Sequence, residues 1–599
     1  MRRPPATLAH ALEEAASIDD ARFTFLDEEA PPRVLTYAEL ARESRRVGGA
    51  LQARGLGRGD RVALILPDNA EFVLAFLGAV RAGVVPVPIY PPTGLGKLTT
   101  YLENTLHIVA RSGARVLLTS REVKALLGTV QARAPELREV TTLDALCRGD
   151  APLRPERLGA ADTCFLQFTS GSTARPKGVV LSHGNLAANV RVIMEEGLQI
   201  RDDDCGLSWL PLYHDMGLIG FVIAPLFHRR SITFMPPLLF LKRPVRWLEE
   251  ISRLRATISF GPNFAYALCV KRVREREMSG LDLSSWRVAG CGAEPIREGD
   301  LRAFSDKFAA VGFDPGALVP SYGMAESTLA VTLSPLGRGV AVDHVDGERL
   351  WSEGVAAPVV ADAPRAAAIV RCGGPAEGHE VAIFGADDLE GARPLGDREV
   401  GEIRVRGPSV TAGYFAEPER SAAAFAGGWL RTGDLGYLAD GEVHICGRAK
   451  EVIILHGRNY YPQDLEWEAS QVAGVRKGNV IAFGTSGADD ARERVVVTFE
   501  TAAPAAEREA IAREIRIRIQ DGLGLSVDEV IALDAGVLPK TSSGKLQRAR
   551  TRELYEAGEL GELRPARGAG RIDLVKALVR SQLGYFRHRV LGGGERDEP

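Results

Sequence analysis

Short apolar runs separated by helical signals constrain the fold of this chain most strongly. Helix signals lie between the runs: Thr36 and Glu39 form a capping-box pattern, and Asp68 with Glu71 begins a helix that ends before Gly83. Near-continuous apolar strands that alternate with helices are typical of parallel sheets covered on both faces. The large first part of the chain is therefore predicted to be α/β. The runs lie at 62–66, 84–89, 116–119, 163–168, 232–235, 257–260 and 288–289.

Length and a change of pattern predict more than one domain. A chain of 599 residues is too long for one ordinary core. Alternating strands follow Gly401, and a smaller unit begins near Gly447, with a strand at 452–455 and a helix from Pro462. We expect a large domain at 1–446, a small domain at 447–560 and a tail at 561–599. Apolar residues at helical spacing predict a helix in the tail: Ile572, Val575, Leu578, Val579 and Leu583.

Composition excludes several classes of protein. A net charge of −4 gives no basic surplus for nucleic acid. The seven cysteines form no CxxC pattern, which favours buried thiols in a reducing cytoplasm over disulfides or a zinc site. No run of 18 apolar residues occurs, and no apolar segment follows Met1, so neither a transmembrane segment nor secretion is expected.

A loop between two apolar strands, 164–168 and 179–181, is the first candidate site. Small hydroxyl residues and glycine bend tightly and expose backbone N–H groups, which can bind anions. Lys177 adds a positive charge beside the loop, so the stretch predicts polyphosphate binding; an ordinary surface turn is the alternative. It is not a Walker A loop, because Lys and Ser/Thr do not follow Gly178. The loop residues are Thr169, Ser170, Gly171, Ser172 and Thr173.

Further candidates lie at the ends of predicted strands and in mobile loops. The segments 290–295 and 321–326 each end a strand in a glycine turn, where open α/β sheets place ligands. His214 lies in a polar break at the start of a helix, and Asp434 is a natural acceptor for ribose hydroxyls. Lys545 follows Ser-Ser-Gly, which allows its ammonium to enter a site and neutralise charge. A structural histidine or a solvated surface charge is the alternative for each.

Taken together, these segments resemble the adenylate-forming superfamily, which includes acyl-CoA synthetases, luciferases and peptide-synthetase adenylation domains. The resemblance extends from the first helix to Arg548. It implies a large N-terminal domain of packed α/β sheets with a distorted β subdomain, and a small, mobile α+β C-terminal domain. It also implies ATP and Mg²⁺ as cofactors.

The resemblance implies a role for each motif residue. Lys545 is the expected catalytic lysine of the first half-reaction, with His214 near the acyl and phosphate sites. Glu326 is expected to bind Mg²⁺, Tyr322 to stack on adenine, and Lys450 to be the interdomain hinge. The expected nucleotide-binding residues are Thr169, Ser170, Gly171, Ser172, Thr173, Lys177, Gly292, Ala293, Ser321, Tyr322, Gly323, Met324, Asp434 and Arg448.

Four stretches resemble one branch, the fatty acyl-AMP ligases. They are 213–217, 262–266, 321–328 and 457–464. The branch implies activation of a fatty acid to an acyl-adenylate, then transfer to the phosphopantetheine thiol of an acyl carrier protein supplied in trans. It also carries an insertion that is thought to restrain the small domain and disfavour coenzyme A. The segment 341–370, with little periodicity, is the candidate insertion, and a longer surface loop is the alternative.

Three other functions remain open at this point. An acyl-CoA synthetase would perform the same first step with coenzyme A as the acceptor. A stand-alone peptide-synthetase adenylation domain would need a charged or polar residue for an α-amino group, and no clear candidate lies near 213–216 or 321–326. The third is an inactive nucleotide or acyl-binding scaffold, against which the joint presence of Lys545, Glu326 and Asp434 argues.

Overall fold

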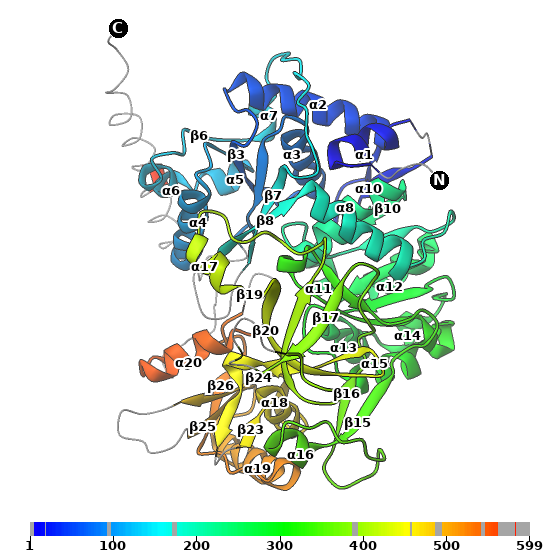
Figure 1. Ribbon diagram of the computed structural model, residues 1–599, viewed down its shortest axis with the longest axis vertical. Coiled ribbons are helices and arrows are strands. Elements are labelled where there is room, and N and C mark those ends of the chain that lie inside the picture. Colours follow the sequence, from blue (N-terminus) through cyan, green and yellow to red (C-terminus); the bar gives the residue numbers. More distant parts are fainter. Residues whose placement is uncertain are drawn as a thin grey trace.

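The computed structural model describes residues 5–17, 20–92, 98–169, 176–385, 388, 393–455, 458–485, 494–540, 545–560 and 581–582. Figure 1 shows an elongated molecule in which the α/β part lies at one end and the elements from β23 to α20 lie at the other. The predicted tail helix lies outside the described residues, apart from 581–582. There, the Ser581 hydroxyl accepts a hydrogen bond from the Gly128 N–H at 2.7 Å. None of the helices in the described ranges has the length and hydrophobicity that a bilayer span requires.

The first sheet is fully parallel, as the sequence predicts. Its strand order is β4-β3-β5-β6, and each neighbouring pair is parallel. Helix α3 packs between this sheet and α2, so it is buried from Phe72 to Arg81. The predicted caps form: Thr36 and Glu39 make the capping box of α2, and Asp68 accepts from the Glu71 N–H at 2.7 Å. The elements of this region are α1 (Leu8–Ala15), α2 (Tyr37–Ala53), β3 (Arg61–Ile65), α3 (Asn69–Arg81), β4 (Val85–Pro88), α4 (Leu98–Ser112), β5 (Val116–Thr119), α5 (Arg121–Lys124), α6 (Gly128–Arg133), β6 (Glu139–Thr141) and α7 (Leu143–Leu146).

The second sheet has eight strands in the order β14-β13-β12-β11-β9-β10-β1-β2. Its centre is parallel, whereas both edge pairs are antiparallel. The strands are β1 (Arg22–Phe25), β2 (Arg33–Thr36), β9 (Gly206–Ser208), β10 (Ile232–Phe234), β11 (Ile258–Gly261), β12 (Val288–Cys291), β13 (Leu318–Gly323) and β14 (Ala330–Leu333). The α-helices of this part are α8 (His183–Arg191), α9 (Asp215–Leu218), α10 (Ala224–His228), α11 (Pro237–Lys242), α12 (Val245–Leu254), α13 (Asn263–Arg272), α14 (Glu275–Met278) and α15 (Glu298–Phe308).

One strand assignment needs correction. The apolar run at 163–168 predicts another parallel strand, but β7 (Thr163–Thr169) pairs antiparallel with β8 (Lys177–Ser182) in a two-stranded hairpin. The loop between them is too short to hold a crossover helix, which a parallel connection needs. The hairpin places Thr169 opposite Lys177, so these two residues close the candidate phosphate loop.

A mostly antiparallel β subdomain links the large and small domains. Its strand order is β17-β18-β20-β19, and β21 also pairs with β20, along residues 434–439. The small domain contains the pair β22–β23 and the sheet β24-β25-β26. The elements are β17 (Glu380–Phe384), β18 (Gly401–Arg406), α17 (Pro418–Ala423), β19 (Phe425–Ala426), β20 (Trp429–Ala439), β21 (Glu442–Arg448), β22 (Ile453–Leu455), β23 (Arg458–Tyr460), α18 (Pro462–Ser470), β24 (Val475–Thr485), β25 (Arg494–Thr501), α19 (Ala505–Leu523), β26 (Glu529–Asp534) and α20 (Arg548–Glu556).

The segment 341–370 is ordered in spite of its weak periodicity. It forms the antiparallel pair β15 (Val342–Asp346) and β16 (Ala366–Val370), with α16 (Gly347–Ser352) between them. Trp351 of α16 stacks on Tyr460 of the small domain with ring centroids 6.2 Å apart. Glu348 accepts from Arg458 at 3.1 Å. The alternative of a plain surface loop is therefore wrong, because the segment has its own sheet and packs on the small domain.

Candidate active site

One large cavity runs between the two domains. Its volume is about 3070 Å³, and its lining includes residues from the carboxyl ends of β11, β12 and β13, from the β subdomain, and from the small domain. Of the predicted site residues within the described ranges, the following line it: Thr169, Lys177, His214, Ala293, Ser321, Tyr322, Gly323, Met324, Glu326, Asp434, Arg448, Lys450 and Lys545. Ser170, Gly171, Ser172 and Thr173 lie outside the described residues. Gly292 lies beside the lining, between Cys291 and Ala293.

A buried carboxylate marks one end of the cavity. Asp434 accepts from the Tyr322 hydroxyl at 2.8 Å through Oδ2 and lies 3.0 Å from Arg448 Nε through Oδ1. Strands β20 and β21 hold the pair, since Asp434 and Arg448 are opposite each other in the register. Burial raises the pKa of Asp434, while the charge of Arg448 and the Tyr322 hydroxyl lower it. A carboxylate has about four acceptor positions, so Asp434 keeps room for further donors.

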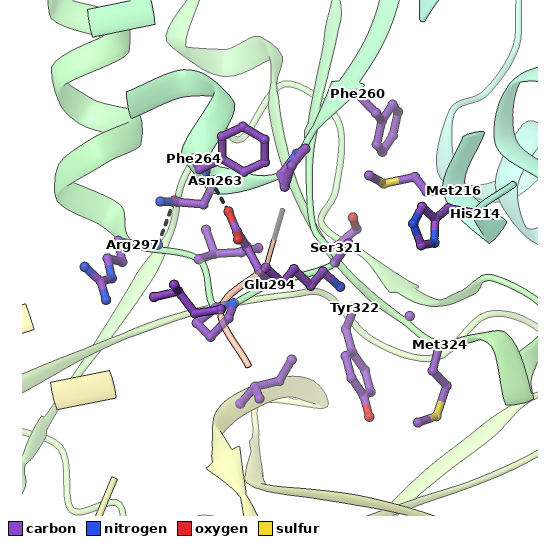
Figure 2. Close-up of a pocket in the computed structure, with 18 of the residues that line it drawn as sticks. His214, Met216, Phe260, Asn263, Phe264, Glu294, Arg297, Ser321, Tyr322 and Met324 are labelled. Atoms are coloured by element: carbon purple, nitrogen blue, oxygen red, sulfur yellow. Dashed lines mark hydrogen bonds between the residues drawn. The ribbon is translucent and has the colours of Figure 1, made fainter. Parts of the chain in front are cut away.

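The turns after β12 and β13 lie against each other. A Cβ on Gly292 would be 2.7 Å from Ser321 Oγ and 2.9 Å from the Ser321 carbonyl oxygen, so this position needs glycine for space. Ala293 has a positive φ of 67°, which is uncommon for a residue with a Cβ. The Ser321 hydroxyl donates to the Cys291 carbonyl at 3.1 Å. Figure 2 shows Ser321, Tyr322 and Met324 along this edge of the pocket.

Glu326 has a partner that the motifs did not reveal. Its Oε1 accepts from the Tyr414 hydroxyl at 2.9 Å, and the Lys177 ammonium lies 4.6 Å from the centroid of the same Tyr414 ring. Tyr414 lies between β18 and α17, in a segment that pairs with β8, which accounts for its closeness to Lys177. Burial and the Glu326 charge raise the pKa of Tyr414, so the phenol stays protonated and donates.

Lys545 reaches the large domain from the small one. Its charge acts on His214, Asp215 and Glu294, lowering the pKa of each. Burial is the larger effect at all three: it lowers the pKa of His214 to about 3 and raises the pKa values of the two carboxyls. His214 lies at the N-cap of α9, as the sequence predicts, and is neutral near pH 7.

Glu294 is a second site residue that sequence reasoning missed. It follows β12 in the segment 290–295, and its Oε1 accepts from the Phe264 N–H at 2.6 Å, in the first turn of α13. Asn263 completes this corner by accepting from the Arg297 N–H at 3.0 Å (Figure 2). A carboxylate that lies against the N-terminus of a helix, as Glu294 does at α13, is favoured by the helix dipole. Its position between α13 and Lys545 depends on the fold and is not visible in the motif.

The predicted hinge is joined to the Lys545 segment. Lys450 lies in a short 3₁₀ turn, Ala449–Glu451. Glu451, its neighbour, pairs with Arg548, and Arg548 also donates to Glu466 of α18 at 2.8 Å. Three charges in one network fix the end of the segment that carries Lys545 to the residues that follow the hinge.

An apolar wall continues from the polar site. Figure 2 places Phe260, Met216 and Phe264 around the pocket on the large-domain side. Apolar lining residues also come from α11, α13, the helical segment Ile219–Ile223 and neighbouring loops: Trp209, Leu212, Phe221, Leu238, Leu241, Ala267 and Leu268. Asp215 lies in the polar part beside His214. It is a half-buried acid within 213–216, the stretch in which the sequence offers no clear candidate for an α-amino group.

Comparison of the chain with known proteins identifies its family. The model of the AMP-binding enzyme family matches residues 12–415. A Caulobacter vibrioides protein provisionally named acyl-CoA synthetase is 38% identical, over 93% of this chain and 96% of its own. The long-chain-fatty-acid–AMP ligase FadD32 of Mycolicibacterium smegmatis is 35% identical, over 90% of this chain and 92% of its own. The medium-chain-fatty-acid–[acyl-carrier-protein] ligase JamA of Moorena producens is 33% identical, over 93% of this chain and 96% of its own.

A solved structure agrees with these relatives. It comes from a study of fatty acyl-adenylate ligases from E. coli and L. pneumophila and superposes with a TM-score of 0.87 at 36% identity. The match covers 93% of this chain and 98% of that structure. The chain therefore belongs to the AMP-binding enzyme family and, within it, to the fatty acyl-AMP ligases, which use ATP to activate fatty acids as acyl-adenylates.

Proposed function

We propose that this ligase activates a fatty acid with ATP and Mg²⁺ and then transfers the acyl group to the phosphopantetheine thiol of an acyl carrier protein. The observation that carries the proposal is the contact of 341–370 with the small domain, through the stacked rings of Trp351 and Tyr460 and the Glu348–Arg458 ion pair. The relative JamA, whose name specifies an acyl carrier protein, supports the same acceptor.

In the first half-reaction, a carboxylate oxygen of the fatty acid attacks the α-phosphorus of ATP. The bond from that phosphorus to the oxygen bridging to the β-phosphate breaks, and pyrophosphate leaves with this oxygen. Lys545 offsets the repulsion between carboxylate and phosphate, and this effect is strong in a site that excludes water. Asp434 accepts the ribose hydroxyls, Tyr322 flanks the adenine, and neutral His214 orients the acyl carboxylate.

Phosphate binding is assigned to the hairpin loop and its closing residues. Thr169 and Lys177 lie opposite each other at its ends, and the loop residues Ser170, Gly171, Ser172 and Thr173 are assigned by their sequence alone. Gly292, Ala293, Ser321, Gly323 and Met324 line the nucleotide between the turns after β12 and β13. Arg448 supports Asp434 and reaches toward ribose or phosphate.

Glu326 fits the Mg²⁺ that accompanies ATP. No cluster of three or more His, Cys, Asp or Glu side chains suited to a metal occurs in the described part of the chain. One carboxylate suffices, because Mg²⁺ takes few protein ligands and completes its shell with phosphate oxygens and water. Tyr414 occupies Oε1 of Glu326, which leaves Oε2 for the ion. When bound, Mg²⁺ would neutralise phosphate charge.

The second half-reaction requires the small domain to rotate about Lys450 and withdraw Lys545. The thiol sulfur attacks the acyl carbonyl carbon, the bond to AMP breaks, and the thiol proton is released. Rotation would separate α16 from β23. A carrier protein brings a binding surface of its own that can offset this cost, whereas free coenzyme A brings much less. All seven cysteines are free, which supports a cytoplasmic location.

Product analysis by mass spectrometry tests the proposal. The protein is incubated with ATP, Mg²⁺ and C8–C16 fatty acids, first with coenzyme A and then with a panel of phosphopantetheinylated carrier proteins. We expect acyl-AMP without acyl-CoA in the first reaction and acyl-carrier in the second. Acyl-CoA as the main product would contradict the proposal and identify a fatty acyl-CoA synthetase, which the Caulobacter relative's name favours. Formation of no adenylate would favour a binding scaffold.

A further inference from the structure

Tyr414 lies between two groups of opposite charge in the cavity. Its hydroxyl donates to Glu326 at 2.9 Å, and its ring face contacts the Lys177 ammonium at 4.6 Å. Cation–π contacts within about 6 Å of a ring centroid are attractive. Lys177 and Glu326 therefore share one neighbour, and no salt bridge joins either of them to another residue of the described ranges.

The backbone fixes Tyr414 in this place from both sides. On the Lys177 side, the Val180 N–H donates to the Gly413 carbonyl at 3.1 Å, and the Phe415 N–H donates to the Gly178 carbonyl at 2.8 Å. On the Glu326 side, the Thr411 N–H donates to the Glu326 carbonyl at 2.8 Å. The segment 411–415 is thus bonded both to the strand that carries Lys177 and to the turn that carries Glu326.

Gly413 lets the chain turn here. Its φ is 143°, and a Cβ at this position would be 2.6 Å from Ser421 Oγ. The same Ser421 hydroxyl accepts from the Tyr414 N–H at 2.9 Å. A larger residue at 413 would displace Ser421 and, with it, the backbone of Tyr414. The local sequence is therefore built to hold the Tyr414 ring in one orientation.

Without the ring, the two charges would be free to meet. Lysine is a point charge on a flexible four-carbon stem, and two opposite charges in a site of low dielectric attract strongly. A direct Lys177–Glu326 ion pair would occupy the carboxylate needed for the metal and the ammonium needed for phosphate. Tyr414 satisfies each group separately, through its hydroxyl and through its ring face.

We propose that Tyr414 is a positioning residue that keeps Lys177 and Glu326 apart, so that the ammonium stays available to the phosphates and the carboxylate to Mg²⁺. This inference rests on the nucleotide and metal sites of the proposed function. It assigns a role to a tyrosine outside the motifs that identify the family in this sequence.

Binding of an ATP analogue tests the role without turnover. The probe is α,β-methylene-ATP, titrated by calorimetry into the full-length protein at a series of Mg²⁺ concentrations. In Tyr414→Phe the ring remains and the hydroxyl is lost. We expect the Mg²⁺ concentration at half-maximal effect to rise about tenfold, because a hydrogen bond to a charged group is removed. The affinity without Mg²⁺ should change less than twofold.

A pair of variants separates a spacer from a merely structural residue. Tyr414→Leu removes hydroxyl and ring, and we expect a larger rise in the Mg²⁺ requirement, since Lys177 can then pair with Glu326. Adding Lys177→Met to Tyr414→Leu removes that ion pair and should return the Mg²⁺ requirement to the value of Lys177→Met alone. If the two substitutions instead multiply in their effects on the Mg²⁺ requirement, the spacer role is wrong.

The controls cover folding and chemistry. Tyr555→Phe removes a hydroxyl that donates to Glu529 at 2.6 Å in the small domain, and it should leave the Mg²⁺ requirement unchanged. Thermal unfolding checks each variant, and Tyr414→Phe retains the packed ring if Tyr414→Leu does not fold. An unchanged Mg²⁺ requirement in Tyr414→Phe would overturn the proposal. A wild-type protein that binds the analogue with Mg²⁺ but makes no acyl-adenylate would contradict the proposed function and leave this test valid.

Discussion

At the scale of single residues, Lys545 brings a positive charge to a site built by another domain. Its charge lowers the pKa of His214, Asp215 and Glu294, all on the large domain. We expect Lys545→Ala to reduce acyl-adenylate formation about 10²- to 10³-fold, as for removal of one electrostatic group from a transition state. The dissociation constant for ATP should change little, because Asp434, Tyr322 and Arg448 lie elsewhere in the cavity.

Pyrophosphate exchange and calorimetric ATP titration measure the two quantities separately. Lys540→Ala is the matched control, since Lys540 precedes the same loop but donates to Asn479 at 2.7 Å. We expect this control to retain most of the exchange rate. An unchanged rate in Lys545→Ala would remove the catalytic assignment of Lys545.

The sequence motifs identified some of the candidate site residues but not others. Asp434, Tyr322 and His214 belong to short stretches that carry the family resemblance, and Tyr322 and His214 also lie at a strand end and a helix start that the local pattern predicts. Tyr414 and Glu294 were missed. Their partners, Lys177 and Phe264, come from other segments, so their roles depend on contacts over long sequence distances that no local pattern encodes.

At the scale of elements, His183 joins two helices and makes their contact sensitive to acid. It begins α8, and its Nδ1 accepts from the Leu8 N–H at the start of α1 at 3.2 Å. Burial lowers the pKa of His183 to about 4, although the charge of Asp162 raises it. Above pH 6.5 the ring is neutral in both the folded and the unfolded state, so it contributes no pH dependence there.

Below pH 6.5 the unfolded chain binds a proton that the folded protein does not. The free energy of unfolding should therefore fall between pH 6.5 and 4, by on the order of 3 kcal/mol from this residue. We expect His183→Gln to make this decline shallower, measured by urea unfolding at several pH values. His10→Gln on the exposed face of α1 is the control. An equally steep decline in His183→Gln would contradict the assignment.

The segment 341–370 shows that packing can determine secondary structure where sequence periodicity does not. Residues 341–370 gave no clear pattern, yet they form β15, α16 and β16. A buried network anchors them to the large domain: Asp343 accepts from Tyr437 at 2.7 Å and from Arg398 at 2.9 Å. Deleting the whole segment would leave Arg398 and Tyr437 without this carboxylate, so a point substitution is the better test.

Trp351→Ala removes the ring that packs on Tyr460 and leaves the Asp343 network intact. We expect the small domain to rotate more readily, with acyl-CoA formation rising at least about tenfold, because truncating a buried tryptophan costs about 3–5 kcal/mol and a tenfold change corresponds to about 1.4 kcal/mol. The ratio of acyl-CoA to acyl-AMP, by mass spectrometry, measures this. Ser352→Ala is the control in the same helix, since its exposed hydroxyl donates to the Glu348 carbonyl within α16. A folded Trp351→Ala protein with no gain in acyl-CoA would contradict the proposed role of the segment 341–370.

At the scale of the whole molecule, the sequence predicted the parts better than their assembly. The parallel first sheet, the parallel centre of the second sheet, the β subdomain and the α+β small domain follow from local patterns and from the resemblance, whereas the antiparallel edge pairs of the second sheet do not. The antiparallel pairing of β7 with β8 was missed, because an apolar run does not specify its partner. The contact between the two domains was not predictable, since it joins single side chains far apart in the chain.

That contact includes a cation–π pair between the domains. The guanidinium of Arg297, on the large domain, lies 5.3 Å from the ring centroid of Trp467 on α18. Asp464, one turn earlier on α18, faces the same arginine. Burial raises the pKa of Asp464 to about 7, and the charge of Arg297 lowers it. These residues hold α18 against the turn that follows β12, and Lys545 is brought into the cavity by the same domain.

We therefore expect Trp467→Ala to slow acyl-adenylate formation about five- to tenfold, the range of one partly desolvated cation–π contact. Transfer of the acyl group from preformed acyl-AMP to a thiol should be unchanged or faster, because that step needs the small domain to leave this position. Trp429→Ala is the matched control. Its ring lies 4.3 Å from the Arg406 guanidinium within the large domain, so both half-reactions should respond alike. If Trp467→Ala slowed both half-reactions equally, the Arg297–Trp467 contact would serve folding alone and not the placement of Lys545.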